Sequence, residues 1–341
     1  MKAFIHIGTE KTGSTSIQNC LLKNQLLLKQ NGIGLVNRFV DENSRKLAAY
    51  CMVNENIDDF FINNGLLDIN SRQKFKLLLK NEIDYEVNKL DGNSNIIISS
   101  EHFHSRLKSE EEVNNLKILL EKYFTDFEVI VYLRRQDLMA MSLYSTALKV
   151  GFSNSNILPV NISENDAYYN YDLLLTKWSN VFGKENITPV IFEKEKFINK
   201  DLLSDFFYRI GINTVDFKKP SKLNHSLAWQ VQFALLSFNK ILSREKYSNQ
   251  KTRLNYLRNK LWTTLSVDYQ GKSLKPLRND AIKFYKIFEE SNKRIGIKWF
   301  KTPNVFSDDF SMYPEEKEKH RLEPEILDVI FEVLKDEIID S

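Results

Sequence analysis

Cysteine, proline and glycine are scarce in this chain of 341 residues, which contains two, seven and eleven of them respectively. Cys20 and Cys51 are too few for a disulfide framework and lack metal-ligand spacing, which favours a reducing compartment such as the cytoplasm. No apolar run approaches the roughly 20 residues that a bilayer-spanning helix needs. We also expect no leader peptide, because the apolar residues 3–7 are too few for one.

A strong charge of either sign is absent as well, since the formal net charge is only +3. A value so close to neutrality gives no overall preference for nucleic acid, so we expect no nucleic-acid partner. The hydrophobic content of 42% is enough for a substantial core, in one large domain or in a core with an appended subdomain. These values predict a globular protein and leave peripheral membrane contact and the oligomeric state open.

Apolar runs alternate with helix-like stretches through the first part of the chain. We expect strands near residues 3–7, 95–99, 129–133 and 187–192, and helices near 15–30, 72–90, 109–122, 136–148 and 168–181. This alternation predicts an α/β fold in which a parallel sheet is flanked by helices on both faces. After residue 200 we expect helices only, near 201–210, 226–242, 246–262, 276–292 and 325–338.

The same pattern suggests a division at residue 230. Residues 1–230 are expected to form the α/β core, with an insertion near residues 40–70 where Asn, Asp and Glu cluster. Residues 231–341 are expected to form a mostly helical C-terminal extension that packs on the core.

The first predicted strand leads into the segment GTEKTGSTS, residues 8–16, which ends at the start of a helix. Gly8 and Gly13 have the spacing of a phosphate-binding loop, so amides of the turn and of the helix N-terminus converge on an anion. Ser14, however, occupies the position of lysine in nucleoside-triphosphate loops, and Lys11 lies two residues before Gly13. Ordinary ATP or GTP binding is therefore disfavoured, although a strand-to-helix turn with capping hydroxyls explains the same residues.

A second motif follows the predicted strand at residues 129–133. Arg134 comes directly after this strand, and Ser142 lies eight residues later in the next predicted helix. A guanidinium binds a dianionic phosphate in bidentate fashion, and a hydroxyl can fix one of the remaining oxygens. Arg135 could instead be a solvated charge at the helix start. Both motifs follow the carboxyl end of a strand, where open α/β sheets bind their ligands.

Together these motifs resemble the two cofactor motifs of the sulfotransferases that use 3′-phosphoadenosine 5′-phosphosulfate. The order Lys-Thr-Gly-Ser-Thr at residues 11–15 is similar to the 5′-phosphosulfate loop, and the flanking residues through Gln18 resemble bacterial members. The resemblance covers about residues 3–230 and implies a P-loop-like three-layer α/β/α fold. It also implies that the cofactor becomes adenosine 3′,5′-bisphosphate without a metal, and that the acceptor is a glycan or a lipid-linked molecule. Residues 231–341 would help to shape the acceptor site.

The resemblance assigns roles to individual residues. Lys11 would neutralise the bridging oxygen as it leaves, whereas Arg134 and Ser142 would bind the 3′-phosphate. Phe192, at the end of the last predicted strand, could stack on the adenine or pack in the core. The other cofactor positions are Thr12, Gly13, Ser14, Thr15 and Ser16 in the first motif, and Asn224 and Ser226, which could equally cap a helix.

Three candidates for the catalytic base follow the predicted strand at residues 95–99. In the sulfotransferase pattern the residue leaving this strand accepts the proton of the acceptor hydroxyl, and Glu101 holds that position. A glutamate titrates at about 4.3, so it is ionised at neutral pH. His102 and His104 are alternatives because imidazole titrates nearest neutrality, although hydrogen bonding at a helix start would also explain them. His6, inside the first strand, is expected to be a core residue.

The predicted reaction is in-line transfer of a sulfuryl group to an acceptor hydroxyl. A P-loop kinase or NTPase with a displaced lysine is the first alternative, and a nucleotide- or glycan-binding module without turnover is the second. The basic stretch at residues 243–260 could line the acceptor site, cover the cofactor, or form a solvated helix face.

Overall fold

The computed structural model describes residues 1–36, 39, 41–90, 94–213, 216–219, 227–242, 251–317 and 319–338. The chain forms two compact units, and each is assembled from three segments of the sequence. Unit 1 comprises Met1–Arg134, Glu164–Leu223 and Glu290–Phe306, and unit 2 comprises Arg135–Ser163, Asn224–Glu289 and Ser307–Ser341. The two units are therefore not separated at one position in the sequence. The division at residue 230 into a cofactor-binding core and an extension that shapes the acceptor site stays a prediction.

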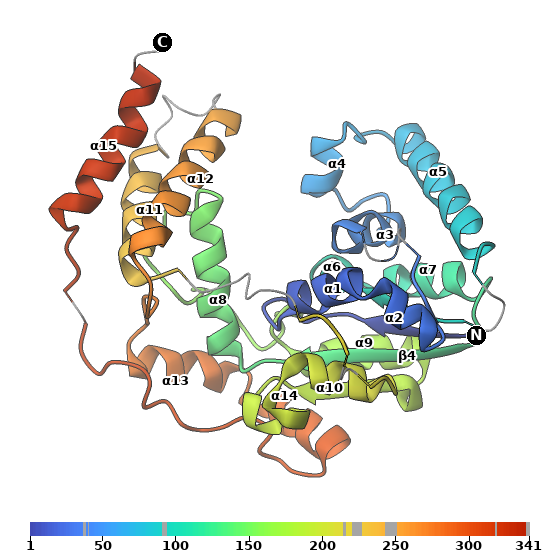
Figure 1. The fold of residues 1–341 in the computed structure, drawn as a ribbon. Coiled ribbons are helices and arrows are strands. Elements are labelled where there is room, and N and C mark those ends of the chain that lie inside the picture. The colour runs from blue at the N-terminus through green and yellow to red at the C-terminus, as the bar shows by residue number, and fades with distance from the viewer. Residues whose placement is uncertain are drawn as a thin grey trace. The chain divides into compact units, whose positions relative to one another are not determined.

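A five-stranded parallel sheet forms the centre of unit 1 (Figure 1). The strand order is β2-β3-β1-β4-β5, with β1 at Lys2–His6, β2 at Ile33–Gly34, β3 at Asn95–Ser99, β4 at Asp126–Leu133 and β5 at Ile187–Ile191. All four strand pairings are parallel. The predicted α/β fold with a parallel sheet is therefore confirmed. The sheet also contains β2, which we did not expect because two residues are too few to show a periodic pattern.

Helices cover both faces of this sheet, as buried parallel strands require. The α-helices of unit 1 are α1 (Ser14–Lys23), α2 (Gln25–Gln30), α3 (Arg45–Cys51), α4 (Asp59–Asn63), α5 (Ile69–Val87), α6 (His102–Arg106), α7 (Glu110–Leu120), α9 (Tyr171–Phe182), α10 (Leu202–Arg209) and, apart from its first residue, α14 (Glu289–Ile295). On one face, Phe4 and Tyr132 share a core cluster with Ile17 of α1 and Phe206 of α10. On the other face, Phe127 of β4 packs edge-on against α9.

The helix ends follow from local sequence. Ser109 and Glu112 form a reciprocal capping box at the start of α7, and the Asn170 side chain accepts a hydrogen bond from Leu173 N at the start of α9. The C-cap residue that follows α9 is Gly183, whose φ of 89° is a conformation that other residues adopt only with strain.

Some expected elements differ in the structure. The helix expected near residues 15–30 is divided at Asn24, whose Nδ2 donates to the carbonyl oxygens of Cys20 and Lys218. The helix expected near 276–292 is divided at Phe288 into α13 (Arg278–Ile287) and α14 (Glu289–Ile295). The region near 40–70, where we expected an insertion, contains α3 and α4.

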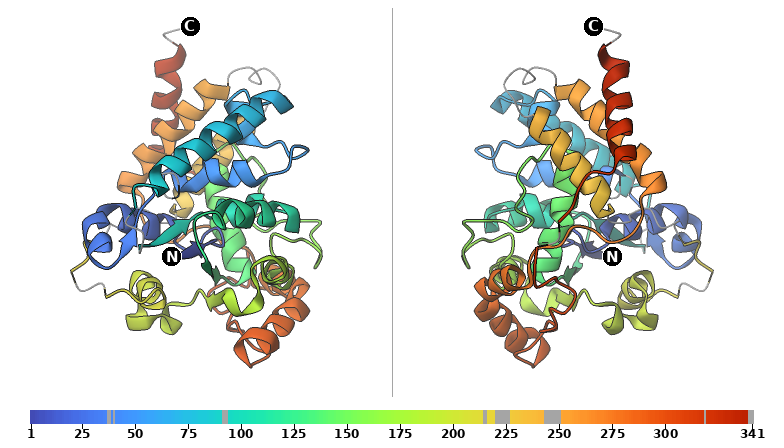
Figure 2. Two further views of the ribbon diagram at one scale, coloured as in Figure 1. Left: turned by 90° about the vertical axis from the view of Figure 1, so that its right-hand side faces the viewer. Right: turned by 90° about the vertical axis from the view of Figure 1, so that its left-hand side faces the viewer.

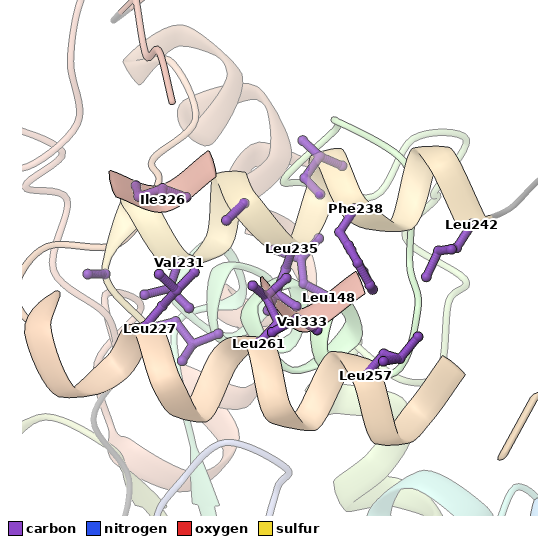
Figure 3. Packing of buried hydrophobic residues seen from close by; sticks show 14 of the residues in the cluster. Leu148, Leu227, Val231, Leu235, Phe238, Leu242, Leu257, Leu261, Ile326 and Val333 are labelled. Carbon is purple, nitrogen blue, oxygen red and sulfur yellow. The ribbon is translucent and has the colours of Figure 1, made fainter. Parts of the chain in front are cut away.

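Unit 2 is helical in its described residues and has its own apolar core. Its helices are α8 (Gln136–Lys149), α11 (Trp229–Leu242), α12 (Lys251–Asp268), α13 and α15 (Pro324–Ile338). Figure 3 shows Leu148 of α8, Leu235 of α11 and Leu261 of α12 meeting in this core, and Figure 2 shows α15 in red alongside α12. No described helix of either unit is both long and apolar enough to cross a bilayer.

The described part of the basic stretch has a structural explanation. Residues 243–250 lie outside the described residues, and α12 contains the rest. The buried Arg258 donates from Nε to Asn239 Oδ1 at 2.8 Å and from Nη1 to Asn255 Oδ1 at 3.0 Å. This arginine is therefore not part of a solvated helix face.

Candidate functional site

The loop at residues 8–16, between β1 and α1, turns through three residues in left-handed backbone conformations. Gly8, Lys11 and Gly13 have positive φ angles of 93°, 64° and 81°. A Cβ at Gly13 would lie 2.3 Å from Leu202 Cδ2, and a Cβ at Gly8 would lie 3.2 Å from Glu101 Cα. Both glycines are thus required by conformation and by space, and the second contact places Glu101 directly beside the loop.

Hydrogen bonds attach this loop to β4. The backbone N and the Oγ1 of Thr9 both donate to the Tyr132 carbonyl oxygen, at 2.9 and 3.0 Å, and Tyr132 N donates to Gly8 O at 2.7 Å. The buried Thr12 Oγ1 donates to Thr9 O at 2.5 Å. The Thr12 side chain therefore stabilises the turn, which leaves its backbone as the part that can face a ligand.

The first turn of α1 contains a buried hydroxyl without a partner. Gly13 is the N-cap of α1 and provides no capping side chain, while its carbonyl oxygen accepts hydrogen bonds from the amides of Ser16 and Ile17. Ser14 Oγ is buried and has no hydrogen-bond partner among the described residues. Leaving such a group unsatisfied costs about 1–3 kcal/mol, and the N-terminus of a helix favours negative charge. An anion bound here would satisfy this hydroxyl. The half-buried Thr15 and Ser16 lie in the same turn.

Two cationic side chains lie at this loop. Arg134 Nη1 donates to Lys11 O at 2.7 Å, and the Arg134 guanidinium lies 5.6 Å from the centroid of the Phe192 ring. The Tyr171 hydroxyl donates to the Arg134 carbonyl oxygen and so holds the backbone after β4. Burial lowers the pKa of Lys11, an effect that Glu10 opposes and Arg134 reinforces. A bound anion would favour the charged form of Lys11 and offset this shift.

Glu101 follows β3 and is held at both carboxylate oxygens. Its Oε2 accepts a hydrogen bond from Gln18 Nε2 at 2.9 Å, and its Oε1 accepts one from Asn43 Nδ2 at 3.1 Å. Burial raises the pKa of Glu101 above its ordinary value, although the hydrogen bond from Gln18 acts in the opposite direction. A carboxylate with a raised pKa is a better proton acceptor at neutral pH.

The two neighbouring histidines are in different environments from Glu101. His104 is buried, with Nε2 3.0 Å from the Tyr168 carbonyl oxygen and Nδ1 3.4 Å from the Glu10 amide nitrogen. Burial lowers the pKa of His104 and that of His102 to about 4. Both imidazoles are therefore neutral at pH 7, and both ring nitrogens of His104 have backbone partners. The Nδ1 of His102 is buried without a partner in the described residues. His6, as expected, is a fully buried core residue.

Several contacts of the site were not predicted from the sequence. The Tyr168 hydroxyl donates to Glu10 Oε2 at 2.6 Å. Burial alone would raise the pKa of Glu10, but hydrogen bonds from Tyr168 and Ser105 bring it below its ordinary value. Gln18 could have been found from the sequence, because it lies four residues after Ser14 and therefore on the same face of the helix. Asn43 and Tyr168 come from distant segments, and no local pattern marks them as site residues.

The remaining predicted cofactor-binding residues do not all belong to the same unit. Arg134 ends unit 1, whereas Ser142 lies in α8 of unit 2, so their joint role stays a prediction. Arg135 is buried, where we had considered a solvated charge. It pairs with Asp137, with an Nε to Oδ1 distance of 2.8 Å. Asn224 and Ser226 lie outside the described residues. The half-buried Phe192 also contacts Tyr132 and Phe197, so its contacts are compatible with both predicted roles.

The described residues contain no group of three or more His, Cys, Asp and Glu side chains that could hold a metal ion. The acidic residues at the site, Glu10 and Glu101, are instead engaged by hydrogen bonds from tyrosine and amide side chains.

Comparisons with known proteins leave the family of the chain open. No protein-family model matches it. A protein of Archaeoglobus fulgidus described as uncharacterized is 28% identical over 218 residues, which are 62% of this chain and 55% of that protein. The match thus spans about half the length of this relative. The crystal structure of a sulfotransferase from Alicyclobacillus acidocaldarius is similar over 75% of this chain and 95% of that one, with a TM-score of 0.38 and 13% identity. A TM-score this low is below what a shared fold requires, so the proposal below depends on the residues of the site.

Proposed function

We propose that this chain is a sulfotransferase that moves a sulfuryl group from 3′-phosphoadenosine 5′-phosphosulfate to a hydroxyl of a glycan or a lipid-linked acceptor. The observation that carries the proposal is the buried, unpartnered Ser14 Oγ in the first turn of α1, next to a left-handed turn that contains Lys11. A hydroxyl donor, helix amides and a cation in one small volume suit a phosphate or sulfate group. The order of Lys11 and Ser14 resembles that of the phosphosulfate loop.

The residues present fit the phosphosulfate end of this nucleotide. The cofactor supplies an activated sulfuryl group when it is bound, and the protein has to hold it and stabilise charge. The amides from Thr12 to Thr15 and the hydroxyls of Ser14 and Ser16 would hold the 5′-phosphate, whereas the Ser16 amide already donates to Gly13 O. Lys11 would stabilise the negative charge that develops on the departing oxygen. Arg134, Ser142 and Phe192 are proposed to bind the 3′-phosphate and the adenine, with Asn224 and Ser226 as further cofactor contacts.

Glu101 is the proposed catalytic base. Its Cα and Cβ lie beside Gly8 of the loop, and its raised pKa suits it to accept the proton of an attacking hydroxyl. Gln18 and Asn43 are positioning residues, because their amides hold the two carboxylate oxygens. His102 and His104 are less suited to this role, since the burial that lowers their pKa to about 4 makes them weak bases.

A binding measurement separates this proposal from its alternatives. Titration calorimetry with adenosine 3′,5′-bisphosphate, in the presence of a metal chelator, should show binding to the full chain. Lys11→Met should weaken it by about tenfold to a hundredfold, because a charged hydrogen bond to phosphate is worth about 1.5–3 kcal/mol. Lys23→Met removes the same charge from an exposed position at the C-terminal end of α1 and should leave binding unchanged.

Activity provides the second half of the test. Transfer of radiolabelled sulfate from the cofactor to a panel of saccharide and glycolipid acceptors should be lost in Glu101→Gln, whereas nucleotide binding should persist. Magnesium-dependent binding of ATP in preference to adenosine 3′,5′-bisphosphate would refute the proposal in favour of a kinase or NTPase. Tight binding of the bisphosphate without transfer to any acceptor would favour a binding module.

A further inference from the structure

Unit 2 contains two cavities of opposite character. The larger has a volume of about 930 Å³ and is lined mainly by apolar side chains, among them Leu158, Phe233, Leu236, Phe284 and Ile287. The smaller has a volume of about 600 Å³, and its lining includes Lys272, Lys275 and Arg278. The larger volume lies within the range of about 300–1,000 Å³ that is typical of sites for small organic ligands.

The two cavities adjoin one another. Lys275 and Pro314 line both of them. The rings of Trp229, in the smaller cavity, and His320, in the larger one, stack with their centroids 4.4 Å apart. An apolar chamber and a cationic one therefore lie side by side at these residues, and we call the two together the amphipathic cavity.

The charge of the amphipathic cavity is strongly one-sided. The basic residues lining it are Lys240, Lys272, Lys275, Arg278, Lys283 and Lys317, whereas Asp280 is the one acidic residue among the described residues of its lining. Some of these cations have partners, since Lys275 Nζ donates to Met312 O at 2.7 Å and Arg278 pairs with the 75% exposed Glu315. Arg278 Nε is nevertheless buried without a hydrogen-bond partner. Such an excess of positive charge favours an anionic ligand.

We propose that the amphipathic cavity binds a single amphiphilic molecule that has a long alkyl chain and an anionic phosphate head group. The alkyl chain would displace water from the apolar chamber around Phe233 and Phe284, and the head group would lie against Lys275 and its basic neighbours. Every residue of this site belongs to unit 2. The inference is therefore independent of the sulfuryl transfer proposed for unit 1.

Titration calorimetry of the full chain with dodecyl phosphate, kept below its micellar concentration, tests this inference. Binding should be at least about a hundredfold tighter than for butyl phosphate, because each methylene that leaves water tightens binding about threefold to fourfold. Binding should also be at least about tenfold tighter than for dodecanol, which has the chain but lacks the charge. These comparisons use the unaltered protein, so they do not depend on the folding of any variant.

Two variants test the location of the site. Ile287→Trp places a larger side chain in the apolar chamber and should weaken dodecyl phosphate binding by about tenfold or more. Lys275→Glu should weaken it similarly by reversing a charge where the two chambers meet. Lys286→Glu makes the same charge change on α13 at an exposed residue that lines neither chamber, and it should bind normally.

Three results would overturn the inference. The first is equal affinity for butyl and dodecyl phosphate, which would exclude burial of the chain. The second is unchanged binding in Ile287→Trp that retains the circular dichroism spectrum of the unaltered protein. The third is binding to anionic phospholipid vesicles without any binding of dodecyl phosphate monomers, which would indicate contact with a membrane surface instead of an occupied cavity.

Discussion

Replacement of Gly13 by alanine should destabilise unit 1 far more than the same change at a glycine with similar backbone geometry. Gly13 has a φ of 81°, and a Cβ at this position would lie 2.3 Å from Leu202 Cδ2. The left-handed conformation costs a residue with a side chain about 1–2 kcal/mol, and overpacking typically adds about 1–3 kcal/mol. We therefore expect Gly13→Ala to lower the free energy of unfolding by about 2–5 kcal/mol.

Gly211 provides the matched control. Its φ of 75° is close to that of Gly13, but no atom lies within 4 Å of the position that its Cβ would occupy. Gly211→Ala should therefore show the conformational cost alone, about 1–2 kcal/mol. The difference between the two variants measures the steric contact with Leu202.

Urea unfolding followed by circular dichroism gives both values, and a double-mutant cycle isolates the contact. In the background of Leu202→Ala the added methyl group at Gly13 has room, so the extra cost of Gly13→Ala should fall by about 1–3 kcal/mol. Equal destabilisation by Gly13→Ala and Gly211→Ala, or no coupling between Gly13 and Leu202, would refute the close approach of α10 to the loop at residues 8–16.

Burial raises the pKa of Glu101 above its ordinary value of about 4.3, so the stability of the unaltered protein relative to Glu101→Gln should be highest below that pH and should fall as the pH rises through the folded-state pKa. Thermal melting of both proteins between pH 4 and 8, in steps of about one unit, measures this relative stability. A difference in melting temperature that stays constant with pH would contradict the raised pKa of Glu101. Arg258→Leu should lower the unfolding free energy by about 1–3 kcal/mol, because Asn239 Oδ1 loses its buried donor; no change in urea unfolding would place Arg258 in solvent. Tyr132→Phe removes the hydroxyl that donates to the buried Asp205 at 2.8 Å and should cost about 1–2 kcal/mol, whereas an unchanged unfolding midpoint would show that this bond contributes nothing.

The parallel sheet was largely predictable because its strands carry their own signal. Residues 95–99 were expected as a strand and form β3 with the same bounds, since a strand buried on both faces is a continuous apolar run. The division of the first helix at Asn24 was not predictable. Asn24 at the division donates to the Lys218 carbonyl oxygen, 194 residues away in the sequence, and no local pattern indicates this partner.

The candidate site divides in the same way. The turn at residues 8–16 could be predicted because glycines, a lysine and a helix start are adjacent in the chain. The contacts of Glu101 could not, since Gln18 is 83 residues and Asn43 is 58 residues away in sequence. Their amides show no periodic or spacing pattern before folding.

The sequence alone determined the α/β class, the turn at residues 8–16 and the residue types within it, because these depend on neighbours in the chain. Only the tertiary structure distinguished residues that look equivalent in the sequence. Arg134 donates to the loop at Lys11, whereas the adjacent Arg135 is buried against Asp137. Burial raises the pKa of Glu101 and lowers that of His104, because desolvation disfavours the charged form of each group. The desolvation of a side chain depends on distant segments that pack against it, so it cannot be predicted from the residues next to it in the sequence.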